Sequence, residues 1–229
     1  MEANMNTQKV GGEKPSLLGM VISPGLQFER MKMSKKVWGM FFLVALLQGL
    51  VGGLGTYVMK TSPEGVKMKE ELVELAGQGS LTLTLEIIYG TVSGFVGAMF
   101  GALFVAAIYK VFMMFFGNDT SYKTLLTIIV YTNIVLIIGG LINTILNLIL
   151  GSGATEYTSL GSFFTEGSFA YEIGNTIEVF NVWNLVLIWL GLQITAGLSK
   201  VKAAIPIIVL FIIVAIFVLI THFLPGMSV

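Results

Sequence analysis

The chain has 229 residues, of which 55% are hydrophobic and only 11% are charged, far below the roughly 25% charged residues of soluble globular domains. This composition excludes a water-soluble fold and indicates one integral membrane domain, and the equal numbers of basic and acidic residues exclude a global basic field that would hold nucleic acid. With no cysteine and one histidine, the chain has no disulfide framework and no Cys- or His-built metal centre.

The chain begins with a polar stretch, residues 1–15, which we expect to be a disordered cytoplasmic tail. Residues 16–36 follow as a basic interfacial segment. Ser23-Pro24 is typical of a helix N-cap followed by proline, so a short helix is expected from Pro24, lying among lipid headgroups. The alternative is a solvated linker that carries pre-membrane lysines. The lipid-facing basic cluster consists of Arg30, Lys32, Lys35 and Lys36.

Five apolar stretches come next, each near or above the roughly 20 residues that a helical crossing needs. They cover residues 37–59, 83–116, 122–150, 177–198 and 204–224. The predicted fold class is therefore all-α: a polytopic integral membrane protein with five transmembrane helices in a domain over residues 37–224. A short outer tail, residues 225–229, follows. The second stretch is too long for one straight perpendicular helix, so we expect it to tilt, kink or begin outside the bilayer.

Basic residues predict the orientation, because Lys and Arg concentrate on the cytoplasmic side of a membrane. With the N-terminus in the cytoplasm, ten of the thirteen basic residues lie inside, and only Lys60, Lys67 and Lys69 lie outside. An odd number of crossings then places Val229 outside. The sequence thus predicts a multi-pass protein of the cell membrane.

The two longer outer loops have different character. Residues 60–79 contain a predicted amphipathic helix over residues 66–76. Residues 151–175 are rich in Gly, Ser, Thr and Phe, and their aromatic side chains are expected to dip into the membrane interface. These aromatic residues are Phe163, Phe164, Phe169 and Tyr171. Neither loop is long enough to form a separate catalytic unit.

Small residues recur at helical spacing on the second stretch, where they make a smooth flank. Such rows let two helix backbones approach closely in lipid, where no hydrophobic driving force holds helices together. Gly49-xxx-Gly53 on the first stretch is the natural mate. The pattern leaves open whether the neighbouring helix belongs to this chain or to another. The predicted helix-packing residues are Gly49, Gly53, Gly90, Gly94, Gly97 and Gly101.

The third and fourth stretches carry polar residues at near-helical spacing, and these two stripes are expected to face each other. One interpretation is a hydrogen-bonded seam that fixes helix register; the other is a hydrated path or substrate groove. The seam is favoured, because no basic residue or carboxylate pair lies deep in a span. The polar seam consists of Asn133, Asn143, Asn147, Glu178, Asn181 and Asn184.

The remaining ionisable and motif-like residues predict no catalytic, cofactor-binding or metal site. Glu86 and Glu178 lie near predicted outer ends and Lys110 near an inner end, where their charges can snorkel to water. His222 is expected to be an interfacial histidine. No phosphate-binding loop, zinc-protease motif or nucleophile elbow occurs. Residues 118–120 match a glycosylation sequon but fall on the predicted cytoplasmic side.

Several short segments together resemble a known family. In chain order they are ISPGLQFER at 22–30, FGNDTSYK at 116–123, and FNVWNLVLIWLGLQ at 180–193 before SKVKA at 199–203. Their order resembles the Yip family, over about residues 16 to 224, and implies a five-helix membrane domain with a cytoplasmic N-terminus. Members often carry a Gly-Tyr pair followed by proline in the third helix. This chain has Tyr131-Thr-Asn133 there, so the kink is not implied.

The short tail and SLLGMVISP at residues 16–24 are similar to the YknW-type bacterial members of that family. This resemblance implies a helper of a MacB-like ABC exporter that protects cells against a toxic peptide. Our first hypothesis is accordingly a non-enzymatic scaffold with no cofactor, whose candidate partners are membrane lipid, ABC exporter subunits and further copies of the chain. The alternatives are a small channel or carrier that uses the polar seam, and a lipid-binding protein that shapes the membrane.

Overall fold

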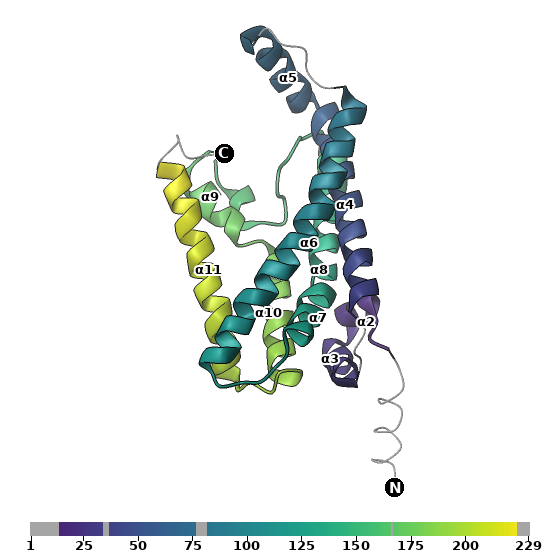
Figure 1. Cartoon of the computed structure of the whole chain (residues 1–229). Coiled ribbons are helices and arrows are strands. Elements are labelled where there is room, and N and C mark those ends of the chain that lie inside the picture. The colour runs from purple at the N-terminus through teal and green to yellow at the C-terminus, as the bar shows by residue number, and fades with distance from the viewer. Residues whose placement is uncertain (1–13, 34–36, 77–81, 166, 224–229) are drawn as a thin grey trace. The chain divides into compact units, whose positions relative to one another are not determined.

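The computed structural model describes residues 14–33, 37–76, 82–165 and 167–223, and these residues are almost entirely helical (Figure 1). Most of the predicted tail over residues 1–15, Lys35, Lys36 and the tail over residues 225–229 lie outside the described residues. The helices are α2 (Leu17–Ile22), α3 (Pro24–Met33), α4 (Trp38–Thr61), α5 (Pro63–Ala76), α6 (Leu83–Phe115), α7 (Tyr122–Thr132), α8 (Ile134–Leu150), the 3-10 helix η1 (Leu160–Phe163), α9 (Phe169–Thr176), α10 (Val179–Ile194) and α11 (Lys200–Phe223).

Four helical segments of the described chain are long and apolar enough to cross a membrane. They cover Trp38–Thr61, Leu83–Phe115, Tyr122–Leu150 and Lys200–Val218. The all-α class is thus confirmed. α6 has 33 residues and is about 50 Å long at 1.5 Å per residue, about 20 Å more than a typical hydrocarbon core. It therefore needs tilt or an extension into the interface.

The predicted fourth span is shorter in the structure than the sequence suggested. α10 has 16 residues and a length of about 24 Å, whereas the expectation was a helix over residues 177–198. At its start, Ile177 is the C-cap of α9 and has φ −107° and ψ 74°. At its end, Gly197 adopts a positive φ of 69°, a left-handed conformation that terminates helices.

The predicted third span consists of two helices in series, α7 and α8. They meet at Asn133, which has φ −61° and ψ −14° and caps α7 without leaving the right-handed region. The interruption is one residue long, and the whole stretch over Tyr122–Leu150 still counts as one apolar span. The helix is therefore interrupted even though the Gly-Tyr and Pro signals typical of the Yip family are missing here.

The segment before the first span holds two helices where one was expected. α3 begins at Pro24, as the Ser23-Pro24 signal predicts. The unforeseen helix is α2, a six-residue helix capped by Ser16, whose Oγ accepts a hydrogen bond from Gly19 N at 3.3 Å. Six residues are too few for hydrophobic periodicity to reveal a helix.

The chain forms two compact units, which are described separately below. The first comprises residues 1–44, 100–136 and 181–229, and the second comprises residues 45–99 and 137–180. The largest fully buried side chains all belong to the first unit, and Tyr109, Phe28 and Met20 lead them. The main hydrophobic core therefore lies in the unit that contains the pre-membrane helices.

Candidate functional site

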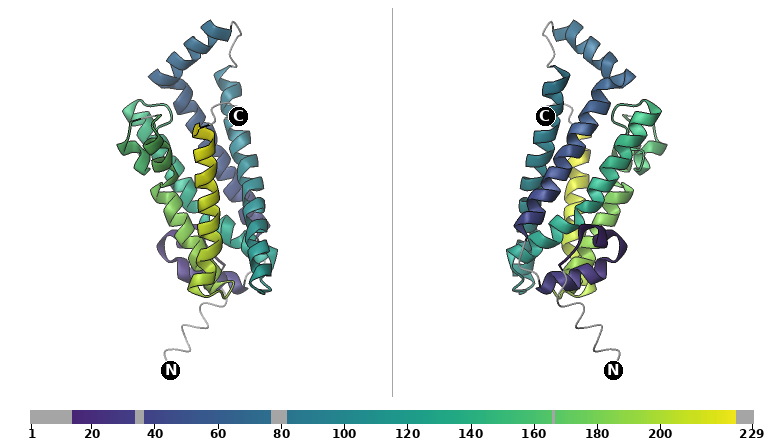
Figure 2. Two further views of the ribbon diagram at one scale, coloured as in Figure 1. Left: turned by 90° about the vertical axis from the view of Figure 1, so that its left-hand side faces the viewer. Right: turned by 90° about the vertical axis from the view of Figure 1, so that its right-hand side faces the viewer.

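The pre-membrane helices α2 and α3 pack against α7 and α10 within the first unit (Figures 1 and 2). Gln27 is buried, and its Oε1 accepts a hydrogen bond from Ser16 N at 2.9 Å. Phe28 is fully buried beside Gly191 of α10, where an added Cβ would lie 2.7 Å from the ring. The alternative of a solvated linker is therefore wrong for residues 24–33, because their apolar face is packed.

The turn between α6 and α7 is fastened to the turn that follows α10. Asn118 Nδ2 donates to the carbonyl oxygen of Ala196 at 3.0 Å, while Asn118 Oδ1 accepts from Thr120 N at 2.9 Å. Lys110 Nζ donates to the carbonyl oxygen of Thr120 at 2.9 Å. Gly117 adopts a positive φ of 64° at this turn, which few residues other than glycine tolerate. The sequon asparagine therefore has a structural role.

The segments that carry the family resemblance meet at this place. Thr195 Oγ1, in the turn after α10, donates to the carbonyl oxygen of Phe28 in α3 at 3.3 Å. Ile128 of α7 and Phe28 both lie against Gly191. We call these contacts among residues 24–33, 116–128 and 191–199 the α3 junction.

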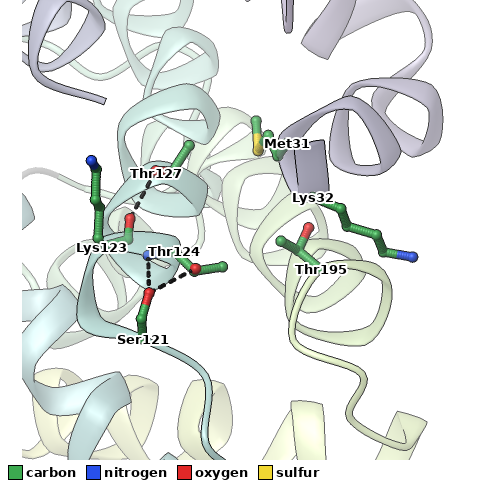
Figure 3. Close-up of a pocket in the computed structure, with 7 residues that line it drawn as sticks. All are labelled: Met31, Lys32, Ser121, Lys123, Thr124, Thr127 and Thr195. Atoms are coloured by element: carbon green, nitrogen blue, oxygen red, sulfur yellow. Dashed lines mark hydrogen bonds between the residues drawn. The ribbon is translucent and has the colours of Figure 1, made fainter. Parts of the chain in front are cut away.

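A pocket of about 350 Å³ opens at the α3 junction, between α3, the start of α7 and the turn after α10 (Figure 3). Met31 is buried, whereas Lys123 and Ser121 are exposed. Figure 3 shows the Ser121 and Thr124 hydroxyls facing each other, and their oxygens are 2.9 Å apart. The lining therefore combines cations, hydroxyls and apolar surface. It consists of Met31, Lys32, Ser121, Lys123, Thr124, Thr127 and Thr195.

Four of the predicted helix-packing residues lie in the second unit where α4 and α6 approach closely. A Cβ added at Gly49 would lie 2.8 Å from the Thr91 carbonyl oxygen, and one added at Gly94 would lie 3.2 Å from Gly49 Cα. Added Cβ atoms at Gly53 and Gly90 would collide with the hydroxyls of Thr91 and Thr56, respectively. Glycine at these positions therefore permits a separation that side chains would forbid.

The remaining predicted packing glycines of α6, Gly97 and Gly101, are open. A Cβ added at either would meet nothing within 4 Å. Phe100 and Phe104 lie beside them with 68% of each side chain exposed. Gly90 and Gly94 of α6 thus approach α4, whereas Gly97 and Gly101 touch no side chain or backbone at that distance.

The polar seam residues of the second unit are joined through a loop threonine. Thr158 Oγ1 accepts from Asn143 Nδ2 at 2.7 Å and donates to Glu178 Oε1 at 2.6 Å. Thr158 N also donates to Asn143 Oδ1 at 3.2 Å. Thr158 thereby joins Asn143 and Glu178 in one network.

Asn147 extends this network one helical turn further along α8. Its Nδ2 donates to the carbonyl oxygens of Asn143 and Thr155, at 2.8 and 2.9 Å, and its Oδ1 accepts from Ser152 Oγ and Thr155 N, at 2.8 and 2.9 Å. The buried amide has all four of its hydrogen-bonding positions occupied. We call Asn143, Asn147, Ser152, Thr155, Thr158 and Glu178 the Thr158 network.

The remaining seam residues lie in the first unit. Asn133 is half-buried at the end of α7, and Asn181 is exposed on α10. Asn184 is buried, and its Nδ2 has no hydrogen-bond partner among the described residues. In the second unit, residues of the 151–178 loop supply hydrogen-bond partners for Asn143 and Asn147.

The other predicted residues occupy ordinary positions. Lys32 Nζ lies 2.8 Å from Glu29 Oε2, and both side chains are exposed. Glu86 Oε1 lies 3.5 Å from Lys60 Nζ. His222 belongs to α11, but its side chain lies outside the described ones. No group of three His, Asp or Glu side chains among the described residues could hold a metal ion.

Glu156 is the ionisable group of the 151–178 loop whose environment perturbs it most clearly. Desolvation by the surrounding protein raises the pKa of its carboxyl above 4.5, and the neighbouring charge of Glu178 raises the pKa further. The side chain still reaches the surface. The carboxyl of Glu156 therefore loses its proton at a higher pH than an ordinary glutamate does.

Sequence reasoning missed the loop residues that complete the Thr158 network. Thr158 and Ser152 lie outside the periodic stretches, so neither helical spacing nor hydropathy singled them out. The signals available were Asn118 beside Gly117 in the 116–123 segment and the abundance of Ser and Thr in residues 151–178. Neither signal indicates which residue such a side chain would hydrogen-bond.

Comparison with known proteins agrees with the resemblance found in the sequence. The family model of the Yip1 domain matches residues 18–221. The membrane protein YknW of Bacillus subtilis (strain 168) is 29% identical over 144 residues, a match that covers 61% of this chain and 62% of YknW. The chain thus spans less than two thirds of that relative's length. No solved structure matches the chain. With a family match over most of its length and four apolar helices long enough to span a bilayer, this chain is a membrane protein that belongs to the Yip1 domain family.

Proposed function

We propose that this protein is a non-enzymatic scaffold in the cell membrane, which binds other integral membrane proteins through its helix faces. The observation that carries the proposal is the open surface at Gly97 and Gly101 on α6. These two glycines leave space for a close helix, while Gly94 of the neighbouring row of small residues already lies against α4. Close approach of small residues is the usual way in which helices associate in lipid.

The partner we propose is a subunit of a MacB-like ABC exporter. The similarity to YknW-type family members supports this choice, and the relative of that type matches over 144 residues. An exporter subunit brings its own membrane helices, and one of these would lie along Gly97 and Gly101, beside the exposed Phe100 and Phe104. Protection against a toxic peptide is the role that the resemblance implies.

The polar seam supports a structural role better than a conducting one. The Asn147 amide has all its bonding positions filled by the protein, and Asn143 is bonded to the loop through Thr158. A hydrated path would instead keep such groups facing water. We expect Asn143→Leu and Asn184→Leu to alter stability and to leave any ion flux in liposomes unchanged.

The topology that we propose has five crossings, with α10 as a short fourth one, the N-terminus in the cytoplasm and the C-terminus outside. An impermeant maleimide tests it, since the chain has no native cysteine. On intact cells, Ala154→Cys and Ser228→Cys should both be labelled, and Lys14→Cys should not. Protection of Ser228→Cys beside labelled Ala154→Cys would mean that α10 does not cross.

Site-directed crosslinking tests the scaffold itself. Gly97→Cys and Gly101→Cys, each fitted with a photoreactive maleimide in native membranes, should crosslink to exporter subunits identified by mass spectrometry. Val92→Cys is the matched control, because it is exposed on the same helix but lies on another side. Equal yields from all three positions, or capture of lipid alone, would contradict the proposal.

A further inference from the structure

The pocket at the α3 junction combines features suited to one chemical class of ligand. Lys32 contributes a cation from α3, and Lys123 contributes one from the first turn of α7. Either the Ser121 or the Thr124 hydroxyl can donate outward, because only one of the two donates to the other. The start of α7 adds the partial positive charge of a helix N-terminus. The combination favours an anionic oxygen-rich group.

The pocket lies next to apolar surface. Tyr122, next to the pocket residues Ser121 and Lys123, begins the apolar span that ends at Leu150. Met31 and the methyl groups of the threonines supply an apolar wall. A ligand there would contact cations on one side and the start of a membrane-spanning helix on the other.

We propose that this pocket binds the phosphate group of an anionic membrane lipid. A lipid is favoured over free phosphate because its glycerol and first methylene groups would cover the apolar wall, which inorganic phosphate would leave wet. This inference goes beyond the scaffold function and does not depend on it.

The lysines are free to reorient toward such a ligand. Figure 3 shows their ammonium groups extending away from the hydroxyls. The ion pair of Lys32 with Glu29 at 2.8 Å is exposed on both sides, and such pairs contribute little to stability. Lys123 is exposed as well. Rotation of these side chains brings both cations to the phosphate at small cost, since long side chains change rotamers freely on surfaces.

Native mass spectrometry of the full chain in detergent provides the test, with phosphatidylglycerol, phosphatidylcholine and inorganic phosphate as probes. We expect phosphatidylglycerol to be retained more strongly than phosphatidylcholine. The double variant Lys32→Gln/Lys123→Gln should retain phosphatidylglycerol about 25-fold less well, from on the order of fivefold per lysine near anionic lipid. The single variant Lys123→Glu should show the same direction of change.

The matched control is Lys14→Gln/Lys200→Gln, which removes the same charge from two exposed lysines that do not line the pocket. Equal losses from the two double variants would overturn the proposal, because the binding would then follow net charge. Equal retention of both phospholipids would overturn it too. Displacement of the lipid by equimolar inorganic phosphate would overturn the lipid as ligand. Circular dichroism of each variant confirms that the helices are intact.

Discussion

Asn118 and Ala196 are 78 positions apart in sequence, yet the side-chain amide of the first donates to the carbonyl oxygen of the second at 3.0 Å. The bond ties the α6–α7 turn to the turn between α10 and α11. Because Asn118 Oδ1 also accepts from Thr120 N, one side chain organises one turn and anchors another. Asn118 thus holds the two turns of the α3 junction together, and we call its two hydrogen bonds the Asn118 clamp.

Asn118→Ala should therefore lower the free energy of unfolding by about 1–3 kcal/mol, the usual cost of leaving partly buried polar groups without partners. Thermal unfolding in detergent, followed by circular dichroism, measures the loss. Asp119→Ala changes the exposed neighbour and serves as the control. Equal effects of the two substitutions would show that the clamp contributes nothing.

Gly94→Val should destabilise the protein by about 1–3 kcal/mol, because the new side chain would meet the α4 backbone near Gly49. Gly97→Val, three residues further along the same helix, meets open space and should leave the melting temperature of the isolated protein almost unchanged. In native membranes, the yield of crosslinking to the partner should show the opposite order. Gly97→Val should lower that yield more than Gly94→Val does. A melting temperature that falls equally for both variants would contradict the conclusion that Gly94 is packed against α4 while Gly97 is open.

Thr158→Val preserves side-chain shape and removes the hydroxyl that joins Asn143 to Glu178. The expected loss is about 1–3 kcal/mol of unfolding free energy, since polar groups packed against the loop lose a partner. Thr165→Val, at an exposed position of the same loop, is the control. An unchanged melting temperature for Thr158→Val would mean that water replaces the hydroxyl without cost.

The raised pKa of Glu156 predicts a pH dependence with a definite sign. Between 4.5, the ordinary value, and the raised value, the folded protein holds a proton that the unfolded chain has released. Stability therefore falls as the pH rises through this window. Glu156→Gln should remove that slope, so its melting temperature should exceed that of the parent near neutral pH and approach it at about pH 4.

Glu178→Gln tests the cause of this shift. It removes the neighbouring charge and leaves the desolvation of Glu156, which is the larger cause. The pH slope should therefore shrink without disappearing. A slope abolished by Glu178→Gln would reverse the order of the two causes, and a slope unchanged by Glu156→Gln would assign the pH dependence to another group.

The helices themselves could be predicted from local patterns, and most of their bounds agree. α6 was expected over residues 83–116 and is found over Leu83–Phe115, because apolar content over one segment depends on no distant contact. α10 was expected to be longer, since hydropathy continues through Thr195 and Ala196 although Gly197 turns the backbone. Composition alone does not report where a chain turns.

The residues of the candidate sites could likewise be predicted only in part. The spacing of Gly49, Gly53, Gly90 and Gly94 was visible in the sequence, as were the asparagines of the seam. That Thr158 would lie between Asn143 and Glu178, or that Lys32 and Lys123 would line one pocket, was not visible. Such contacts join residues separated by loops, and spacing within one helix carries no information about them.

By itself, the sequence determined that this protein lives in a membrane, is helical and belongs to the Yip family, because hydrophobic length and short ordered motifs are local properties. Only the tertiary structure decided which glycines of α6 lie against α4 and which polar residues share a network. Those outcomes depend on how closely α4 approaches α6 and where the 151–178 loop folds back. Both depend on packing between segments distant in sequence, and that packing leaves Gly97 and Gly101 uncovered.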